Sequence, residues 1–239
     1  MTRDLLWLLG LIALFPALAS AIAPVLVVAE PKSREAAVTA TLFPEVEVVA
    51  PSGLGQHQSS LVGRKLLFVG TTALQNKSAL PGIERAIAAA PKVMISSPLV
   101  LTLKALVEKE SGGKVVALQT LNRAMQPGYA IQQINLVPNV NFGFPGDRFR
   151  LRGTLTLASR NPIFLGAPHC RPAMEIDIFE DQKVAADPEV VAAHYPLSLV
   201  CPRRSGRGSL ILSGFEFADL ETSSLNLERL RDFLWNLIR

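Results

Sequence analysis

The sequence is poor in the residues from which metal centres and nucleophilic sites are usually built. Its 239 residues include three histidines and two cysteines. His169 precedes Cys170, but Cys201 lies far along the chain, and no paired spacing such as Cys-x-x-Cys occurs. A structural metal site generally needs four such ligands at short spacings. The sequence therefore predicts neither a metal site nor a cofactor.

Long apolar runs are equally scarce, and the one that exists lies at the N-terminus. It extends over residues 5–23 and ends in the small residues Ala19-Ser20-Ala21. A short charged start, an apolar stretch and an A-x-A site are typical of a secretory signal peptide. We therefore expect residues 1–21 to be a signal peptide cleaved after Ala21, with an uncleaved membrane anchor as the alternative. Either form would place residues 24–239 outside the cytoplasm, as a periplasmic, secreted or N-terminally anchored domain.

Export changes what the two cysteines are expected to do. An even number of cysteines in an oxidising compartment favours a disulfide, here Cys170–Cys201. A bond closing a loop of about thirty residues would contribute on the order of 3 kcal/mol. The alternative is a reactive Cys170 thiol beside His169, which would need the histidine to act as its base.

The net charge of +4 comes partly from two groups of arginines. Arg203, Arg204 and Arg207 form one group, and three alternating arginines at 148, 150 and 152 form the other. Such groups can bind phosphates, heparin-like polymers or nucleic acid. Alternation with Phe149 and Leu151 instead indicates a solvated strand face, and the other group indicates a basic turn. We therefore predict no nucleic-acid partner.

Apolar runs and helical patterns alternate in the first half of the chain. Strands are expected at 25–29, 46–49, 65–69, 92–95 and 114–118, helices at 33–42, 81–90 and 99–110, and a polar loop at 54–60. Continuous apolar strands between helices are typical of a parallel sheet that is covered on both faces. The predicted fold class is α/β, an open and mostly parallel sheet with helices on both faces.

The second half has short strand-like runs separated by turn residues. They lie at 130–137, 149–157, 175–179, 190–194, 197–200 and 209–213. We expect them to extend the sheet with antiparallel strands. Leu227, Leu230, Leu234 and Leu237 hold helical spacing near the end and predict a C-terminal amphipathic helix.

Four short segments in this order resemble parts of a known superfamily. They are 25–29, 65–72, 161–168 and 205–214, with Asn161-Pro162-Ile163 and Gly206-Arg207-Gly208 as the most specific phrases. The set resembles class I glutamine amidotransferase-like proteins, chiefly their trehalose-utilisation and biotin-ligase-N-terminal branches. The resemblance implies an open α/β fold and, in active members, a cysteine nucleophile in a sharp turn with a late His-Pro-Glu phrase.

The catalytic residues implied by that resemblance are absent from the matching positions. The strand at 92–95 is followed by Ser96-Ser97-Pro98, with no cysteine. The strand at 209–213 is followed by Gly214-Phe215-Glu216, so Glu216 could correspond to the acid but no histidine precedes it. Without a thiol and an imidazole, amide hydrolysis through a thiolate has no chemistry available. Ser96 or Ser97 could be a serine nucleophile, but a serine before Pro98 more simply predicts a helix cap.

The sequence thus favours a non-catalytic exported domain that binds a small molecule or a partner protein in an envelope-associated assembly. The alternative is a hydrolase or amidotransferase-like enzyme that uses Ser96, Ser97 or a Cys170 thiol. Open α/β sheets bind ligands beyond the carboxyl ends of their strands. The candidate binding residues at those ends are Glu30, Ser52, Gly53, Thr71, Thr72, Ser96 and Ser97.

Overall fold

A computed structural model describes residues 22–43, 45–120, 130–136, 154–155, 163–179, 193–220 and 224–238. The predicted leader and the arginines at 148, 150 and 152 lie outside these residues. Within them, no helix has both the length and the apolar character needed to cross a bilayer.

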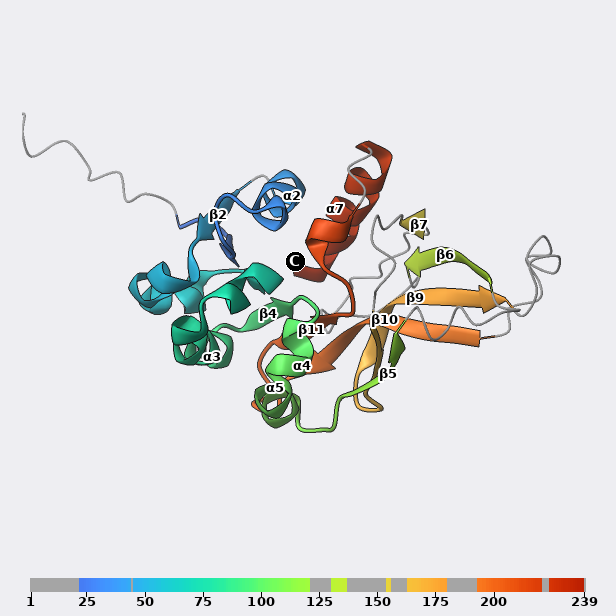
Figure 1. The fold of residues 1–239 in the computed structure, drawn as a ribbon. Coiled ribbons are helices and arrows are strands. Elements are labelled where there is room, and N and C mark those ends of the chain that lie inside the picture. The colour runs from blue at the N-terminus through green and yellow to red at the C-terminus, as the bar shows by residue number, and fades with distance from the viewer. Residues whose placement is uncertain are drawn as a thin grey trace, which may run out of the picture.

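A nine-stranded sheet forms the centre of the fold (Figure 1). Five neighbouring strands run parallel in the order β2-β1-β3-β4-β11. They are β1 (Val25–Val28), β2 (Val46–Val49), β3 (Leu66–Val69), β4 (Lys92–Ile95) and β11 (Ser209–Ser213). Every residue of β1, β3 and β11 is buried, as expected for strands covered on both faces.

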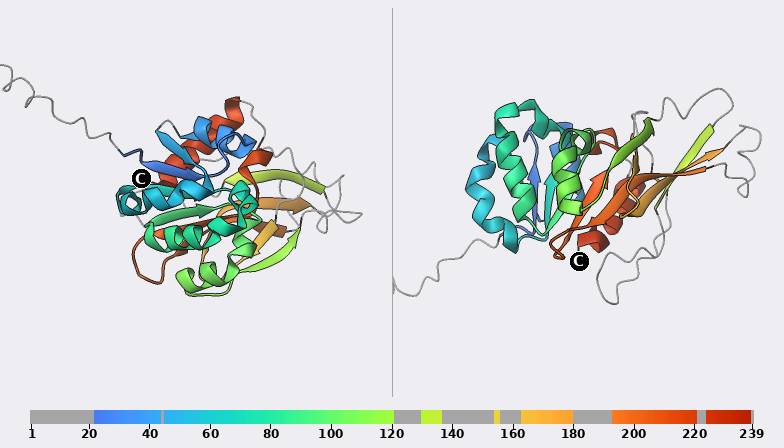
Figure 2. Two further views of the ribbon diagram at one scale, coloured as in Figure 1. Left: turned by 60° about the vertical axis from the view of Figure 1, so that its left-hand side comes forward. Right: turned by 90° about the horizontal axis from the view of Figure 1, so that it is seen from below.

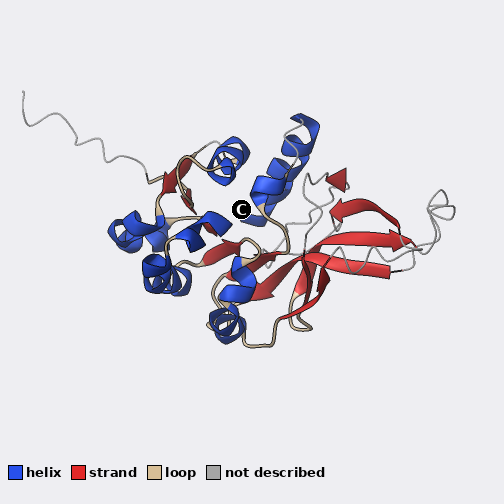
Figure 3. Ribbon diagram, viewed as in Figure 1, coloured by secondary structure: helices blue, strands red, loops and turns tan. Residues whose placement is uncertain are grey.

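Antiparallel strands continue the sheet beyond β11, as the sequence predicts. Their order is β10-β9-β6-β7. They are β10 (Ala193–Pro202), β9 (Arg171–Phe179), β6 (Ala130–Leu136) and β7 (Thr154–Leu155). Figure 3 shows these strands extending away from the end of the sheet where most helices gather.

Helices cover both faces of the parallel strands (Figure 2). One core contains Val25 and Val27 of β1 with α2 (Arg34–Leu42) and α7 (Ser224–Ile238). The other contains Leu26 and Val28 and belongs to the opposite face. Its helices are the 3-10 helix η1 (Pro51–Gly63), α3 (Leu80–Ala89), α4 (Leu99–Thr102) and α5 (Lys104–Ser111). The alternation of side chains along β1 explains the division, because successive residues point to opposite faces.

The predicted helix ends are largely confirmed. The Ser33 hydroxyl caps α2 by accepting a hydrogen bond from the Ala36 N–H at 3.1 Å. Gly112 ends α5 with a φ of +77°, in the left-handed region that glycine adopts at low cost. In α7, Leu230 and Leu234 are buried in the core, as their spacing predicts.

Four local predictions were wrong. The segment after Gly113 does not join the parallel sheet, because β5 (Val116–Thr120) pairs antiparallel with β8 (Ile163–Gly166) in a separate sheet. Residues 54–60 lie within η1 rather than in a loop. The expected helix at 99–110 is interrupted at Leu103. The two short strands expected at 190–194 and 197–200 are the single bulged strand β10.

Candidate functional site

The strand order creates a topological switch point between β1 and β3. The chain leaves β1 for β2 on one side and later forms β3 on the other side of β1. Ligands in open α/β sheets bind outside the carboxyl ends of the strands at such a point. Glu30 follows β1, and Thr71 and Thr72 begin η2 (Thr71–Gln75) directly after β3 and Gly70. Three of the predicted binding residues therefore flank the switch point.

A buried carboxylate already occupies the turn after β3. Glu35, in the first turn of α2, is only 1% exposed. Its Oε1 accepts from the Thr71 N–H at 2.9 Å, and its Oε2 accepts from the Thr72 N–H at 3.0 Å and the Thr72 hydroxyl at 3.1 Å. A Cβ added to Gly70 would collide with the Glu35 carboxylate, so glycine lets the two groups approach. The backbone donors that could bind an anionic ligand are thus bonded to the protein itself.

The same turn is tied to its neighbours by further hydrogen bonds. The Glu30 N–H donates to Thr72 Oγ1 at 3.0 Å, which joins the ends of β1 and β3. The Thr71 hydroxyl donates to the Ser97 carbonyl at 2.6 Å, which joins β3 to the segment after β4. Glu30, Thr71 and Thr72 remain half-buried, so they line the accessible part of this end of the sheet.

The two serines after β4 lie in the core. Ser96 is fully buried and Ser97 is 5% exposed. The Ser96 hydroxyl donates to the Phe215 carbonyl at 3.1 Å, which leaves it aimed at the segment after β11. Neither serine caps the following helix: the cap position of α4 is Pro98, and no side chain bonds to that helix end. The predicted cap was wrong because the Ser96 hydroxyl finds a partner far away in the sequence.

Acidic side chains meet on the β11 side of this edge. Glu216 follows β11, and Asp219 ends the short η5 (Phe217–Asp219). Burial raises the pKa of Glu216, and the negative charges of Asp219 and Glu35 raise it further. Burial also raises the pKa of Glu35, against the opposing effect of the hydrogen bonds from Thr72 and Thr71. A carboxyl group near other carboxylates holds its proton to higher pH.

Ser52 and Gly53 lie apart from these residues. They begin η1 after β2, where the Gly53 N–H donates to the Ala50 carbonyl at 2.9 Å. Ser52 is exposed and Gly53 is half-buried. Among the described residues, no hydrogen bond connects either of them to Glu30, Thr71 or Thr72.

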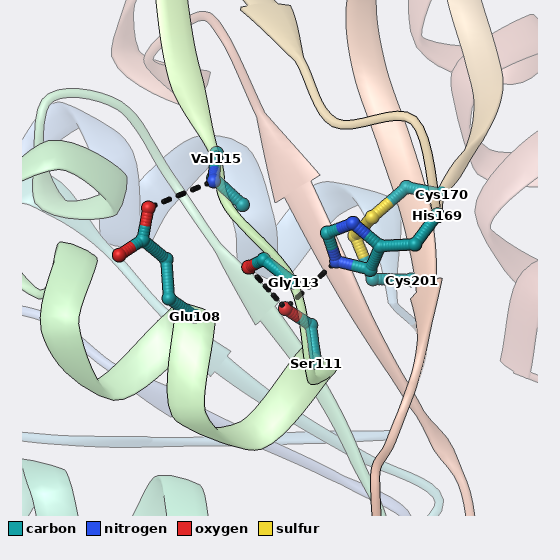
Figure 4. Close-up of a disulfide and its surroundings, with 7 residues drawn as sticks. All are labelled: Glu108, Ser111, Gly113, Val115, His169, Cys170 and Cys201. Carbon is teal, nitrogen blue, oxygen red and sulfur yellow. Dashed lines mark hydrogen bonds between the residues drawn. A yellow bond between two sulfur atoms is a disulfide. The ribbon is translucent and has the colours of Figure 1, made fainter.

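The cysteines are bonded to each other, and the predicted disulfide is confirmed (Figure 4). Cys170 and Cys201 have Cα atoms 4.3 Å apart, and neither is free. The His169 ring lies next to this bond, with Nε2 3.0 Å from the Ser111 hydroxyl. The three ligand atoms of His169, Cys170 and Cys201 lie within 4.8 Å of one another. Both sulfurs are engaged in the disulfide, however, so this cluster offers neither a thiolate nucleophile nor a set of metal ligands.

Glu35 is the site residue that the sequence did not single out. Its position in the first turn of α2 predicted a helix-dipole contact at most. A glutamate in the first turn of the helix after β1, together with a glycine and two threonines after β3, is the pattern that could have indicated it. The pattern is visible only after the strands are known to be neighbours.

Comparison with solved structures gives distant neighbours. No protein-family model and no curated protein matches the sequence. A candidate GMP synthase protein from Thermoplasma acidophilum has a TM-score of 0.48 at 14% identity, covering 89% of this chain and 92% of its own. A ThuA-like protein from Bacteroides uniformis has a TM-score of 0.42 at 10% identity, covering 93% and 95%.

An exo-β-1,4-mannosidase from Opitutaceae bacterium strain TAV5 has a TM-score of 0.45 at 10% identity. The match covers 91% of this chain but 35% of the mannosidase. Identities of 10–14% with TM-scores below 0.5 show neither family membership nor activity.

Proposed function

We propose that this protein is an exported, non-catalytic α/β domain that binds a small molecule or a partner protein at the switch point between β1 and β3, within an envelope-associated assembly. The observation that supports this most is the state of the groups that could act as nucleophiles. The Ser96 hydroxyl is buried and donates to the Phe215 carbonyl, and both cysteines are in the disulfide.

Catalysis by nucleophilic attack would need a different arrangement. A serine or cysteine nucleophile must reach the substrate and must be hydrogen-bonded to a base. Among the described residues, no histidine contacts Ser96 or Ser97, and His169 bonds to Ser111 instead. The hydrolase and amidotransferase-like alternatives are therefore not favoured.

Binding is supported by the half-buried polar groups that remain at the switch point. Glu30, Thr71 and Thr72 are fixed by hydrogen bonds across β1, β3 and the start of α2. A site held by hydrogen bonds between neighbouring elements is pre-organised, which lowers the cost of ordering it on binding. The amides and hydroxyls of Thr71 and Thr72 are already hydrogen-bonded to Glu35 and Ser97, so the bound group would meet the Glu30 carboxylate rather than a free anion site.

A serine-reactive fluorophosphonate probe tests the non-catalytic part of the proposal. We expect no labelling of the native protein, because the Ser96 hydroxyl is inaccessible. Labelling that disappears in Ser96→Ala or Ser97→Ala would refute it. Lys104→Ala, an exposed substitution on α5, is the matched control for non-specific labelling.

A photo-crosslinking residue at position 72 tests the location of the binding site in cells. We expect an adduct that is absent when the same residue replaces exposed Arg85 on α3, away from the strand ends. Equal crosslinking at both positions, or none at position 72, would contradict binding at the switch point.

A further inference from the structure

The opposite edge of the parallel sheet, where the strands begin, has a different chemical character. The register places Val46, Val25, Leu66, Lys92 and Ser209 in one row across β2, β1, β3, β4 and β11. Neighbouring strands are about 4.8 Å apart, so the row spans roughly 20 Å. Residues that directly precede this row, or that join it from the neighbouring turns, share one edge of the molecule.

Exposed basic side chains gather at this edge. Lys65 precedes β3, Arg204 and Arg207 lie in the turn before β11, Lys109 and Lys114 flank the end of α5, and Arg171 begins β9. Arg171 has an interaction partner of its own, and we call the other five residues, Lys65, Lys109, Lys114, Arg204 and Arg207, the amino-edge surface. The Arg204 N–H donates to the Glu110 carbonyl at 2.7 Å, which places the turn before β11 against the end of α5. Arg171 pairs with Val200 in the sheet register, two residues from Pro202, which pairs with Ser209.

Acidic side chains at the same edge are largely paired. Glu47 bonds to Arg64 at 2.6 Å, and Glu110 bonds to Arg203 at 2.9 Å. Both of these arginines are buried and are separate from the amino-edge surface. Glu45, before β2, is exposed. The exposed charge at this edge is therefore predominantly positive.

Exposed apolar side chains accompany this charge. Among the residues that the structure describes, the exposed large hydrophobic ones are Ile22, Val62 and Val116, at 55%, 73% and 41%. Ile22 precedes β1, Val62 lies at the end of η1 just before β3, and Val116 begins β5 after Lys114. The Lys65 N–H donates to the Pro24 carbonyl at 2.8 Å, so the start of β3 lies beside the residues that precede β1.

We propose that the amino-edge surface lies against an anionic lipid membrane. Lysines and arginines close to an anionic leaflet are attracted to it, and exposed apolar side chains enter the interface. The arrangement turns the switch point between β1 and β3 away from the membrane, although the lipid contact does not depend on the proposed ligand site.

Hydrogen exchange of the mature chain, which we expect to begin at Ile22, in the presence of lipid nanodiscs tests this proposal. We compare neutral phosphatidylcholine discs with discs containing about 30% phosphatidylglycerol. Peptides covering residues 62–66 and 203–208 should exchange about fivefold more slowly in the anionic discs. Peptides covering 70–75 and 214–219, at the carboxyl edge, should not change. The protection should disappear at about 0.5 M salt, because screening weakens contacts between surface charges.

A charge-reversal variant with a matched control sharpens the test. The amino-edge variant combines Lys65→Glu, Arg204→Glu and Arg207→Glu. It should exchange at the same rate in neutral and anionic discs. The control variant reverses three exposed lysines at the carboxyl edge, by Lys32→Glu, Lys77→Glu and Lys104→Glu. It should keep the slower exchange in anionic discs. Equal exchange in both lipids, protection at the carboxyl edge, or the same loss in both variants would overturn the proposal. The proposal would also be overturned if heparin, added to the neutral discs, slowed the exchange while anionic lipid did not. That result would indicate a polyanionic partner. The wild-type comparison and its salt dependence decide the matter even if the amino-edge variant does not fold.

Discussion

Removing the Glu35 carboxylate tests whether its hydrogen bonds to Thr71 and Thr72, which we call the Glu35 clamp, hold the turn after β3. In Glu35→Ala, the Thr71 and Thr72 N–H groups and the Thr72 hydroxyl lose their acceptor. Leaving a partly buried donor unpaired costs about 1–3 kcal/mol. The variant no longer buries a carboxylate away from water, and this gain offsets part of the loss of stability. We therefore expect a net loss of about 3 kcal/mol in the free energy of unfolding.

Two other variants separate the clamp from a general effect of mutation. Glu35→Gln keeps the volume and one amide oxygen, so it should cost about half as much as Glu35→Ala. Glu84→Ala removes an exposed carboxylate from α3 and should stay within about 0.5 kcal/mol of the wild type. Urea denaturation followed by circular dichroism gives all three values. A loss below about 0.5 kcal/mol for Glu35→Ala would refute the reasoning, because the three hydrogen bonds would then contribute nothing measurable.

The stability difference between the wild type and Glu35→Gln should change with pH in a defined direction. Burial raises the pKa of Glu35 in the folded protein, so the folded state holds this proton to higher pH than the unfolded chain does. The stability contributed by this proton is complete below the unfolded pKa and is lost as pH rises through the folded one. Glu35→Gln has no such group. It also removes one of the negative charges that raise the pKa of Glu216, and both effects act in the same direction. The advantage of the wild type over Glu35→Gln should therefore be largest at acid pH and should shrink toward neutrality, and growth instead would contradict the raised pKa.

Three further predictions follow from the core, the disulfide and the leader. Leu230→Asp should unfold or precipitate the protein, because it places an unpaired carboxylate in the core at a cost above about 4 kcal/mol, whereas exposed Arg231→Asp should melt like the wild type. Replacing Cys170 and Cys201 together by serine should cost about 3–4 kcal/mol by denaturation, and the native protein should show no thiol before reduction; two free native thiols would exclude the bond. Intact mass of the exported protein should begin at Ile22, while a form that starts at Met1 and stays with membranes would favour the anchor.

Local patterns predicted the elements of the parallel sheet well, because a buried strand and an amphipathic helix are specified by a few adjacent residues. The strands at 46–49, 92–95 and 209–213 have the predicted bounds. The pairing of two segments was predicted wrongly. The run at 209–213 was assigned to the antiparallel half, yet β11 lies parallel to β4. The segment at 114–118 was assigned to the sheet, yet β5 pairs with β8. Both choices depend on contacts between residues that are distant in sequence, which a short apolar run does not encode.

The glycine turn before β11 shows how a motif can be recognised in sequence for a reason that only the structure explains. Gly208 has a φ of +83°, and a Cβ there would collide with the Pro91 carbonyl oxygen. The phrase Gly206-Arg207-Gly208 therefore meets a packing requirement, because the backbone of this turn must pass closely over the start of β4. This requirement explains the resemblance at these residues without any catalytic role.

The candidate site was predictable in position but not in chemistry. Strand ends identified Glu30, Thr71 and Thr72, because ligands in this class of fold bind at the carboxyl edge. Whether a polar residue at that edge is available or engaged depends on its partner. The Ser96 hydroxyl bonds to the carbonyl of Phe215, and the Thr71 and Thr72 amides bond to Glu35 in α2. Each of these contacts joins elements that are neighbours only in the folded sheet. As a result, groups that look like a nucleophile or an anion-binding amide in the sequence form structural hydrogen bonds. The Thr71 and Thr72 hydroxyls likewise donate to the Ser97 carbonyl and to Glu35, so of the three predicted residues Glu30 is the one whose side chain remains for a ligand at this edge.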